Sequence, residues 1–108
     1  MLEEELHYKI LQALDKNPEM SQRELADKMN LSLGKINYCV KALIEKGWIK
    51  ARNFKNSKNK LAYLYILTPS GIEGKTKLTV NFLHRKIQEY DLLKVEIESL
   101  QGEINRNS

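Results

Sequence analysis

The stretch "LSLGKINYCVKALIEKGW", residues 31–48, predicts a helix that begins after a serine and ends at a glycine. Ser32 is of a type that caps helix N-termini, and Gly47 is the type that most often ends helices. Between these two residues, apolar side chains recur at the 3.6-residue helical spacing, at Ile36, Cys39, Val40 and Leu43. The sequence therefore predicts an amphipathic helix with one buried face and one polar, basic face.

Two shorter helices are predicted before this one. The first has an apolar face and ends at Asn17-Pro18, because proline cannot continue a helix. Its apolar positions are Leu6, Ile10, Ala13 and Leu14. The second begins at a capping box formed by Ser21 and Glu24. Its predicted inward positions are Leu25, Ala26 and Met29.

The pattern changes after Gly47. The segments "WIKARNF" and "LAYLYIL" are rich in aromatic and branched residues, and the polar "KNSKNK" lies between them, which predicts a hairpin with a basic tip. Trp48 is interpreted as a core residue. In the second strand, Tyr63 and Tyr65 alternate with Leu64 and Ile66, so that one of these two pairs faces outward. Thr68 and Pro69 then begin a last helix, with no helix breaker before Gly102.

The composition indicates one small, mainly helical domain. The chain has 108 residues, of which 42% are hydrophobic and 30% are charged. It has no apolar run long enough for a membrane span and no signal-peptide pattern, so that we expect a cytoplasmic protein without a membrane partner. The single cysteine and two distant histidines form no metal-ligand pattern. No catalytic set or phosphate-binding loop is present, and we expect neither an enzyme nor a cofactor.

The charge is unevenly distributed along the chain. Residues 31–67 carry eight basic residues and one acidic residue, whereas residues 1–30 have a net charge of −3 and residues 68–108 are neutral. Such a basic region is typical of a nucleic-acid-binding surface. Solvated lysines without a partner are the alternative interpretation.

The order of three short helices, a basic hairpin and a long closing helix is that of a winged helix-turn-helix domain. The stretches "SQRELADKMNLSLGKINYCVKALIEKGWI" and "YILTPSG" resemble the MarR family of bacterial transcription regulators, over roughly residues 5–75. The short length and the coiled-coil-like tail are most similar to the MarR-like regulators associated with exopolysaccharide gene clusters. We expect a winged helix-turn-helix domain over 1–68 and a dimerisation helix over 69–108.

Two departures from the family pattern affect what the resemblance implies. The family wing has an Asp-x-Arg whose arginine enters the minor groove, and Asn59 and Leu61 stand at those positions here. Family members also have a further N-terminal dimerisation helix that helps form an effector pocket, and this sequence begins too close to its first helix to supply one. We therefore expect neither that arginine contact nor a small-molecule effector.

A helix that enters the major groove of double-stranded DNA needs outward side chains that reach base edges. Candidate residues on this helix are Gly34, Lys35, Asn37, Tyr38 and Lys41. At the helix starts, Ser21, Gln22 and Ser32 can hold phosphates, although capping is the other role of the two serines. On the hairpin, the candidates for phosphate or minor-groove contacts are Arg52, Lys55, Lys58 and Lys60.

The last helix carries an apolar stripe that nothing else in this short chain can cover. It consists of Leu83, Ile87, Tyr90, Leu93, Ile97, Leu100 and Ile104. This spacing predicts a homodimer through a coiled coil, with parallel and antiparallel pairing both open. The predicted function is a sequence-specific regulator on a pseudo-palindromic operator. The alternative is a winged-helix module that binds protein or RNA without operator specificity. Cys39 is interpreted as a packed core thiol rather than an oxidant sensor.

Overall fold

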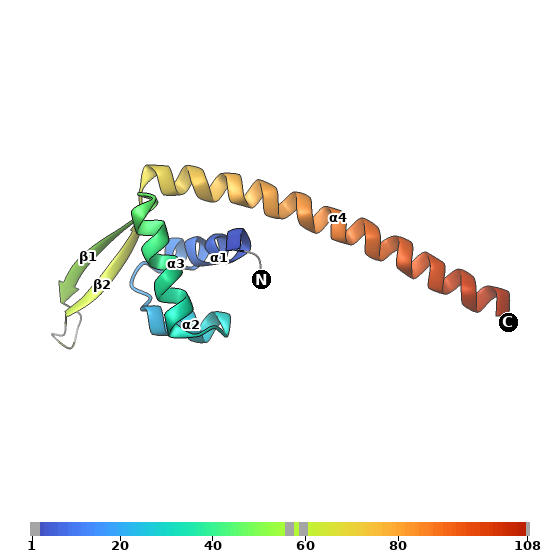
Figure 1. Ribbon diagram of the computed structural model, residues 1–108, viewed down its shortest axis with the longest axis horizontal. Coiled ribbons are helices and arrows are strands. Elements are labelled where there is room, and N and C mark those ends of the chain that lie inside the picture. Colours follow the sequence, from blue (N-terminus) through green and yellow to red (C-terminus); the bar gives the residue numbers. More distant parts are fainter. Residues whose placement is uncertain (1–2, 56–57, 59–60, 108) are drawn as a thin grey trace. The chain divides into compact units, whose positions relative to one another are not determined.

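The computed structural model describes residues 3–55, 58 and 61–107, in two compact units, Met1–Leu78 and Thr79–Ser108. Their elements are labelled in Figure 1. In chain order they are α1 (Glu3–Lys16), α2 (Gln22–Met29), α3 (Leu33–Glu45), β1 (Ile49–Lys55), β2 (Leu61–Leu67) and α4 (Pro69–Asn107). The chain is thus mainly helical with one small antiparallel sheet, and the predicted winged-helix fold with a long last helix is confirmed.

The helix ends lie where the local signals predicted them. The Ser21 hydroxyl oxygen accepts a hydrogen bond from the backbone N–H of Glu24 at 3.0 Å, and Ser32 accepts one from Lys35 at 3.1 Å. Each serine therefore satisfies a backbone donor that the first helical turn leaves unpaired. Gly47 follows α3 with φ of 78°, a left-handed conformation that favours glycine.

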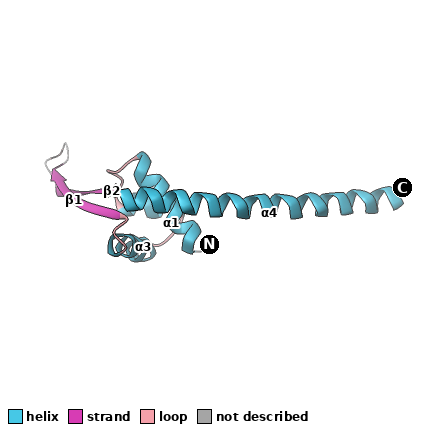
Figure 2. Cartoon of the chain, turned by 90° about the horizontal axis from the view of Figure 1, so that it is seen from above, coloured by secondary structure: helices cyan, strands magenta, loops and turns pink. Residues whose placement is uncertain are grey.

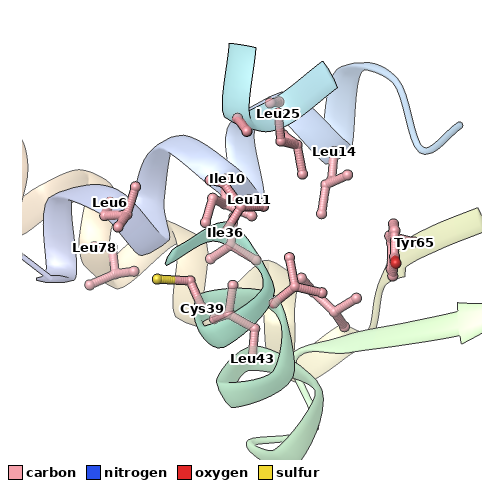
Figure 3. Close-up of a cluster of buried hydrophobic side chains, with 14 residues drawn as sticks. Leu6, Ile10, Leu11, Leu14, Leu25, Ile36, Cys39, Leu43, Tyr65 and Leu78 are labelled. Atoms are coloured by element: carbon pink, nitrogen blue, oxygen red, sulfur yellow. The ribbon is translucent and has the colours of Figure 1, made fainter. Parts of the chain in front are cut away.

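The core of the first unit lies where α1, α2 and α3 meet the base of the sheet (Figure 3). Helix α1 contributes most of it, including Ile10 and Leu11, which have no exposed surface. All four predicted inward residues of α3 are buried, among them Cys39. Figure 3 shows the sulfur of Cys39 among the core side chains on the side of Leu78. The prediction of a packed core thiol is confirmed.

The two strands form one antiparallel hairpin, drawn in magenta in Figure 2. Its register pairs Ile49 with Leu67 at the base. The predicted simple alternation of faces in β2 is wrong, because Tyr65 is buried while Tyr63 on the same face is 56% exposed. The backbone explains this difference: the Tyr65 N–H donates to the carbonyl of Pro18 at 3.0 Å, so that only the base of the hairpin lies against the helices.

Helix α4 begins with the predicted cap and packs tightly on Trp48. The Thr68 hydroxyl oxygen accepts from the Gly71 N–H at 3.0 Å and the hydroxyl donates to the Gly47 carbonyl at 2.5 Å. A Cβ atom on Gly71 would collide with the Trp48 backbone, so glycine permits this close approach. Trp48 is partly buried against the core, as predicted. The helix also continues through Gly102, because one glycine weakens a helix without breaking it.

His7 is a buried ionisable residue that should make stability depend on pH. It is 7% exposed, and no hydrogen-bond partner reaches its Nε2 atom within the described residues. Burial lowers the pKa of His7 below 6.5; Lys46 and Lys35 act in the same direction, and Glu3 and Glu4 oppose them.

The lowered pKa of His7 means that the unfolded chain binds a proton more readily than the folded chain. The free energy of unfolding should therefore be highest above about pH 6.5 and decrease as the pH falls toward the folded-state pKa. In urea titrations between about pH 7 and about pH 5, the variant His7→Gln should lose less stability than the parent. The exposed His84→Gln should behave like the parent, and equal slopes for parent and His7→Gln would contradict this role.

Candidate nucleic-acid interface

Helix α3 places all its candidate contact residues on its solvent side. Each of them is exposed, and they are Gly34, Lys35, Asn37, Tyr38 and Lys41. The Lys35 Nζ atom lies 5.4 Å from the centre of the Tyr38 ring, within the range of a cation–π contact. This side of α3 is thus polar and basic, while its other side is core.

A chain of hydrogen bonds connects this face of α3 to α2 and to the sheet. The Asn37 Nδ2 atom donates to Gln22 Oε1 at 3.1 Å, and the Gln22 Nε2 atom donates to the Tyr65 hydroxyl at 3.1 Å. Tyr65 is 5% exposed and therefore a fixed end point. The two bonds hold the Gln22 amide between Tyr65 and Asn37, with its oxygen toward Asn37.

The positioning role of Tyr65 was not predicted from the sequence. Tyr65 is 43 positions from Gln22, and Gln22 is 15 positions from Asn37. No local pattern connects positions so far apart, because the contact depends on how β2 packs beside α2. Of these three residues, Gln22 and Asn37 were predicted as contacts.

An open pocket of about 680 Å³ adjoins this hydrogen-bonded chain. It lies where the N-terminal ends of α2 and α3 meet strand β2. Among its lining residues are Ser21, Gln22, Gly34 and Asn37, which were predicted as contacts. The sequence reasoning missed others, namely Glu19, Arg23, Leu33, Ala62, Tyr63 and Tyr65. Among these, Arg23 is exposed in the first turn of α2, and its positive charge is a sequence signal for a phosphate contact.

The serines at the helix starts are engaged in capping. In addition to accepting from the Glu24 N–H, the Ser21 hydroxyl donates to the Glu24 carboxylate at 3.2 Å. The capping role of both serines is confirmed, and phosphate binding by Ser21 and Ser32 stays a prediction.

The wing residues are placed only in part. Arg52 and Lys55 lie exposed on β1, and Lys58 is exposed at the hairpin tip. The predicted contact Lys60 lies outside the described residues. So does Asn59, which stands where the family wing has an aspartate.

The described residues contain no group of three His, Cys, Asp or Glu side chains that could hold a metal ion. Burial raises the pKa of the Cys39 thiol, which opposes formation of the reactive thiolate.

The second unit carries the predicted dimerisation stripe on the later part of α4. All seven residues of this stripe are exposed, with exposed fractions of their side chains between 46% and 68%. None of the described helices is both long enough and apolar enough to cross a membrane.

Comparison with known proteins establishes the fold. Residues 3–50 match the family model described as winged helix-turn-helix DNA-binding. The structure is similar to a MarR/EmrR family transcriptional regulator from Acinetobacter sp. ADP1, with 22% identity and a TM-score of 0.61, over 93% of this chain and 75% of that chain. It is also similar to the transcriptional regulator BldR from Sulfolobus solfataricus, with 22% identity and a TM-score of 0.60, over 94% and 73% of the respective chains.

A third similar structure is that of the PcaV transcriptional regulator from Streptomyces coelicolor. It has 19% identity and a TM-score of 0.60, over 90% of this chain and 79% of that chain. No curated protein sequence is significantly similar to the chain. At these identities, the shared feature is the winged helix-turn-helix fold.

Proposed function

We propose that this protein is a sequence-specific DNA-binding transcriptional regulator of the MarR type, which binds a pseudo-palindromic operator as a homodimer. Helix α3 enters the major groove, and the basic wing contacts the backbone or the adjacent minor groove. The observation that carries the proposal is the exposed face of α3, where Asn37 is held by Gln22 and flanked by Lys35.

The exposed amide of Asn37 can pair with adenine. Adenine presents the N7 acceptor and the N6 donor in the major groove, and one asparagine amide can pair with both. Asn37 has two N–H groups on Nδ2, of which one is donated to Gln22. The other N–H and the Oδ1 atom form the donor–acceptor pair that adenine needs.

One side of the pocket beside α3 carries groups that attract a phosphate, while Leu33, Ala62 and Tyr63 make another side apolar. The first backbone N–H groups of a helix and the positive end of its dipole attract anions. Arg23 and Gln22 from α2 and Gly34 from α3 adjoin this pocket. A phosphate there would fix the protein on the duplex without reading its sequence.

Within the MarR type, we place the chain in the subgroup associated with exopolysaccharide gene clusters, because of the coiled-coil-like apolar stripe on its last helix. Staphylococcus aureus MarR, with 23% identity and a TM-score of 0.56 over 82% of this chain and 56% of that chain, was solved in complex with salicylate and kanamycin. The DNA contacts proposed for the present protein involve no effector.

The competing function is a winged-helix module that binds protein or RNA. A protein-binding module would present an apolar or acidic outer face on α3, whereas the observed face is polar and basic. An RNA-binding module would share that basic face and differs from the proposed regulator in having no preference for operator DNA. A gel-shift of the purified protein against the DNA upstream of its own gene, titrated with salt, tests the proposal. Retention of that DNA in preference to a scrambled duplex is expected; equal retention of both would contradict operator specificity.

Lys58 and Lys60 are expected to contribute affinity without specificity. Replacing both with glutamine removes two cations that can neutralise phosphates, so that the slope of log affinity against log salt should decrease by about two units at most. The loss should be the same on operator and on random DNA. An unchanged slope would show that these two lysines do not contact phosphates. A loss of affinity confined to the operator would show that they read its sequence.

A further inference from the structure

The second unit is a stretch of α4 in which every large apolar residue except the half-buried Phe82 is exposed. We propose that this stretch pairs with a second copy of the chain in parallel orientation and in register, and that its charged residues exclude the antiparallel arrangement. The inference rests on the homodimer of the proposed function and adds the orientation of its two helices.

The apolar stripe has a regular heptad pattern from Tyr90 onward. Successive positions are three and four residues apart: Tyr90, Leu93, Ile97, Leu100 and Ile104. In heptad notation, Tyr90 and the two isoleucines take position a and the two leucines take position d. All five side chains are at least 46% exposed on one continuous helix. Among parallel coiled coils, a β-branched residue at a with leucine at d favours two strands.

The residues that flank this stripe are strongly asymmetric. The position before each a residue, called g, is occupied by Glu89, Glu96 and Glu103. The position after each d residue, called e, is occupied by Lys94 and Gln101. All of these side chains are exposed. One edge of the stripe is therefore acidic, while the other is basic or neutral.

In a parallel pair, each g residue faces the e residue five positions further along the second copy. Glu89 then faces Lys94 of the second copy, and Glu96 faces Gln101 of the second copy. The first pair is an ion pair that occurs twice in the symmetric dimer, and the second can form a hydrogen bond. No like charges face each other across these positions.

In an antiparallel pair, g residues face g residues and e residues face e residues. The alignment that places Ile97 opposite Leu93 also places Glu96 opposite Glu96, and Lys94 opposite Lys94. Shifting the pair by one heptad places Glu89 opposite Glu96, or Glu96 opposite Glu103. Each of these alignments brings carboxylates together, so the charge pattern selects the parallel form.

Parallel pairing also suits the operator. The coiled coil then begins at the same residue in both copies, so both DNA-binding units are tethered through equal lengths of chain to the same end of it. Two recognition helices can in this way be offered to two nearby half-sites.

Single cysteines at two heights of the seam test the orientation. In the parallel form, Leu93→Cys and Leu100→Cys each place a thiol opposite its own copy, and both variants should form an interchain disulfide under mild oxidation. In an antiparallel pair, only one height can lie on the two-fold axis, so at most one variant would do so. The parent, whose Cys39 is fully buried, is the control.

A charge exchange provides a second readout that does not depend on disulfide formation. Lys94→Glu should weaken the parallel dimer by about tenfold, because the new carboxylate of each copy then faces Glu89 of the other copy. Adding Glu89→Lys should restore most of the affinity. In the antiparallel alignment Lys94 already faces Lys94, so the single exchange would leave self-association nearly unchanged. Arg106→Glu makes the same change in charge outside the seam and should have little effect.

The outcomes separate the orientation from the dimer itself. A parent that sediments as a monomer would overturn the dimer of the proposed function. A parent that sediments as a dimer, in which only one or neither cysteine variant forms the disulfide, would overturn the parallel orientation alone. Disulfides at both heights and rescue by the charge exchange would support it.

Discussion

Replacing Leu93 and Ile97 with aspartate is expected to yield a monomer that binds operator DNA at least about a hundredfold more weakly than the parent. Both side chains lie on the exposed stripe, and their burial in a dimer would contribute about 25 cal/mol per Å² of apolar surface. Aspartates would place four charges in that seam. The loss on DNA follows because a single unit reads few base pairs, whereas linking two units makes the second contact intramolecular.

A matched control keeps the charge and moves it off the stripe. Val95→Asp with Ser99→Asp adds the same two carboxylates to exposed positions outside the seam, and it should leave both the dimer and DNA binding intact. Sedimentation at micromolar concentration and circular dichroism measure assembly and fold. Full operator binding by the Leu93→Asp/Ile97→Asp variant would show that the dimer account is wrong.

The variants Asn37→Ala and Lys35→Ala should each weaken operator binding by about 1–3 kcal/mol while the fold is unchanged. Both side chains are exposed on α3, so that their removal leaves the core intact. For Asn37 the loss should be confined to the operator, since it removes base readout. Binding to random DNA should be nearly unaffected by this variant.

The hydrogen-bonded chain gives this prediction an internal check. Gln22→Ala removes the group that accepts from Asn37 without removing Asn37 itself, so it should reproduce part of the loss. In the double variant Gln22→Ala/Asn37→Ala, the loss of binding free energy should be smaller than the sum of the two single losses, because both substitutions disrupt the same contact. If Asn37→Ala and Lys35→Ala both bind the operator as tightly as the parent, this face of α3 does not read bases.

The sequence predicted the elements of the fold because their ends depend on local chemistry. Ser21, Ser32 and Gly47 each act on backbone groups within a few residues, so that their positions alone indicated the ends of α2 and α3. The buried face of α3 followed in the same way from the helical period.

Contacts between distant residues could not be predicted in this way. The bond from Gln22 to Tyr65 and the different burial of Tyr63 and Tyr65 depend on where the base of the hairpin lies against the helices. The burial of His7 likewise depends on packing, because nothing in its neighbours distinguishes it from an exposed histidine. The candidate interface was therefore predicted as a set of residues, whereas its internal connections required the structure.

Selection of bound sequences from a pool of random DNA duplexes tests the central claim most directly. A dimeric reader with α3 in the major groove should enrich an inverted repeat, whose half-sites are centred about 10–10.5 base pairs apart or a multiple of that distance. The same selection with Asn37→Ala should lose preference at one base pair of each half-site. A pool without enrichment, or an enriched site without two-fold symmetry, would contradict the account.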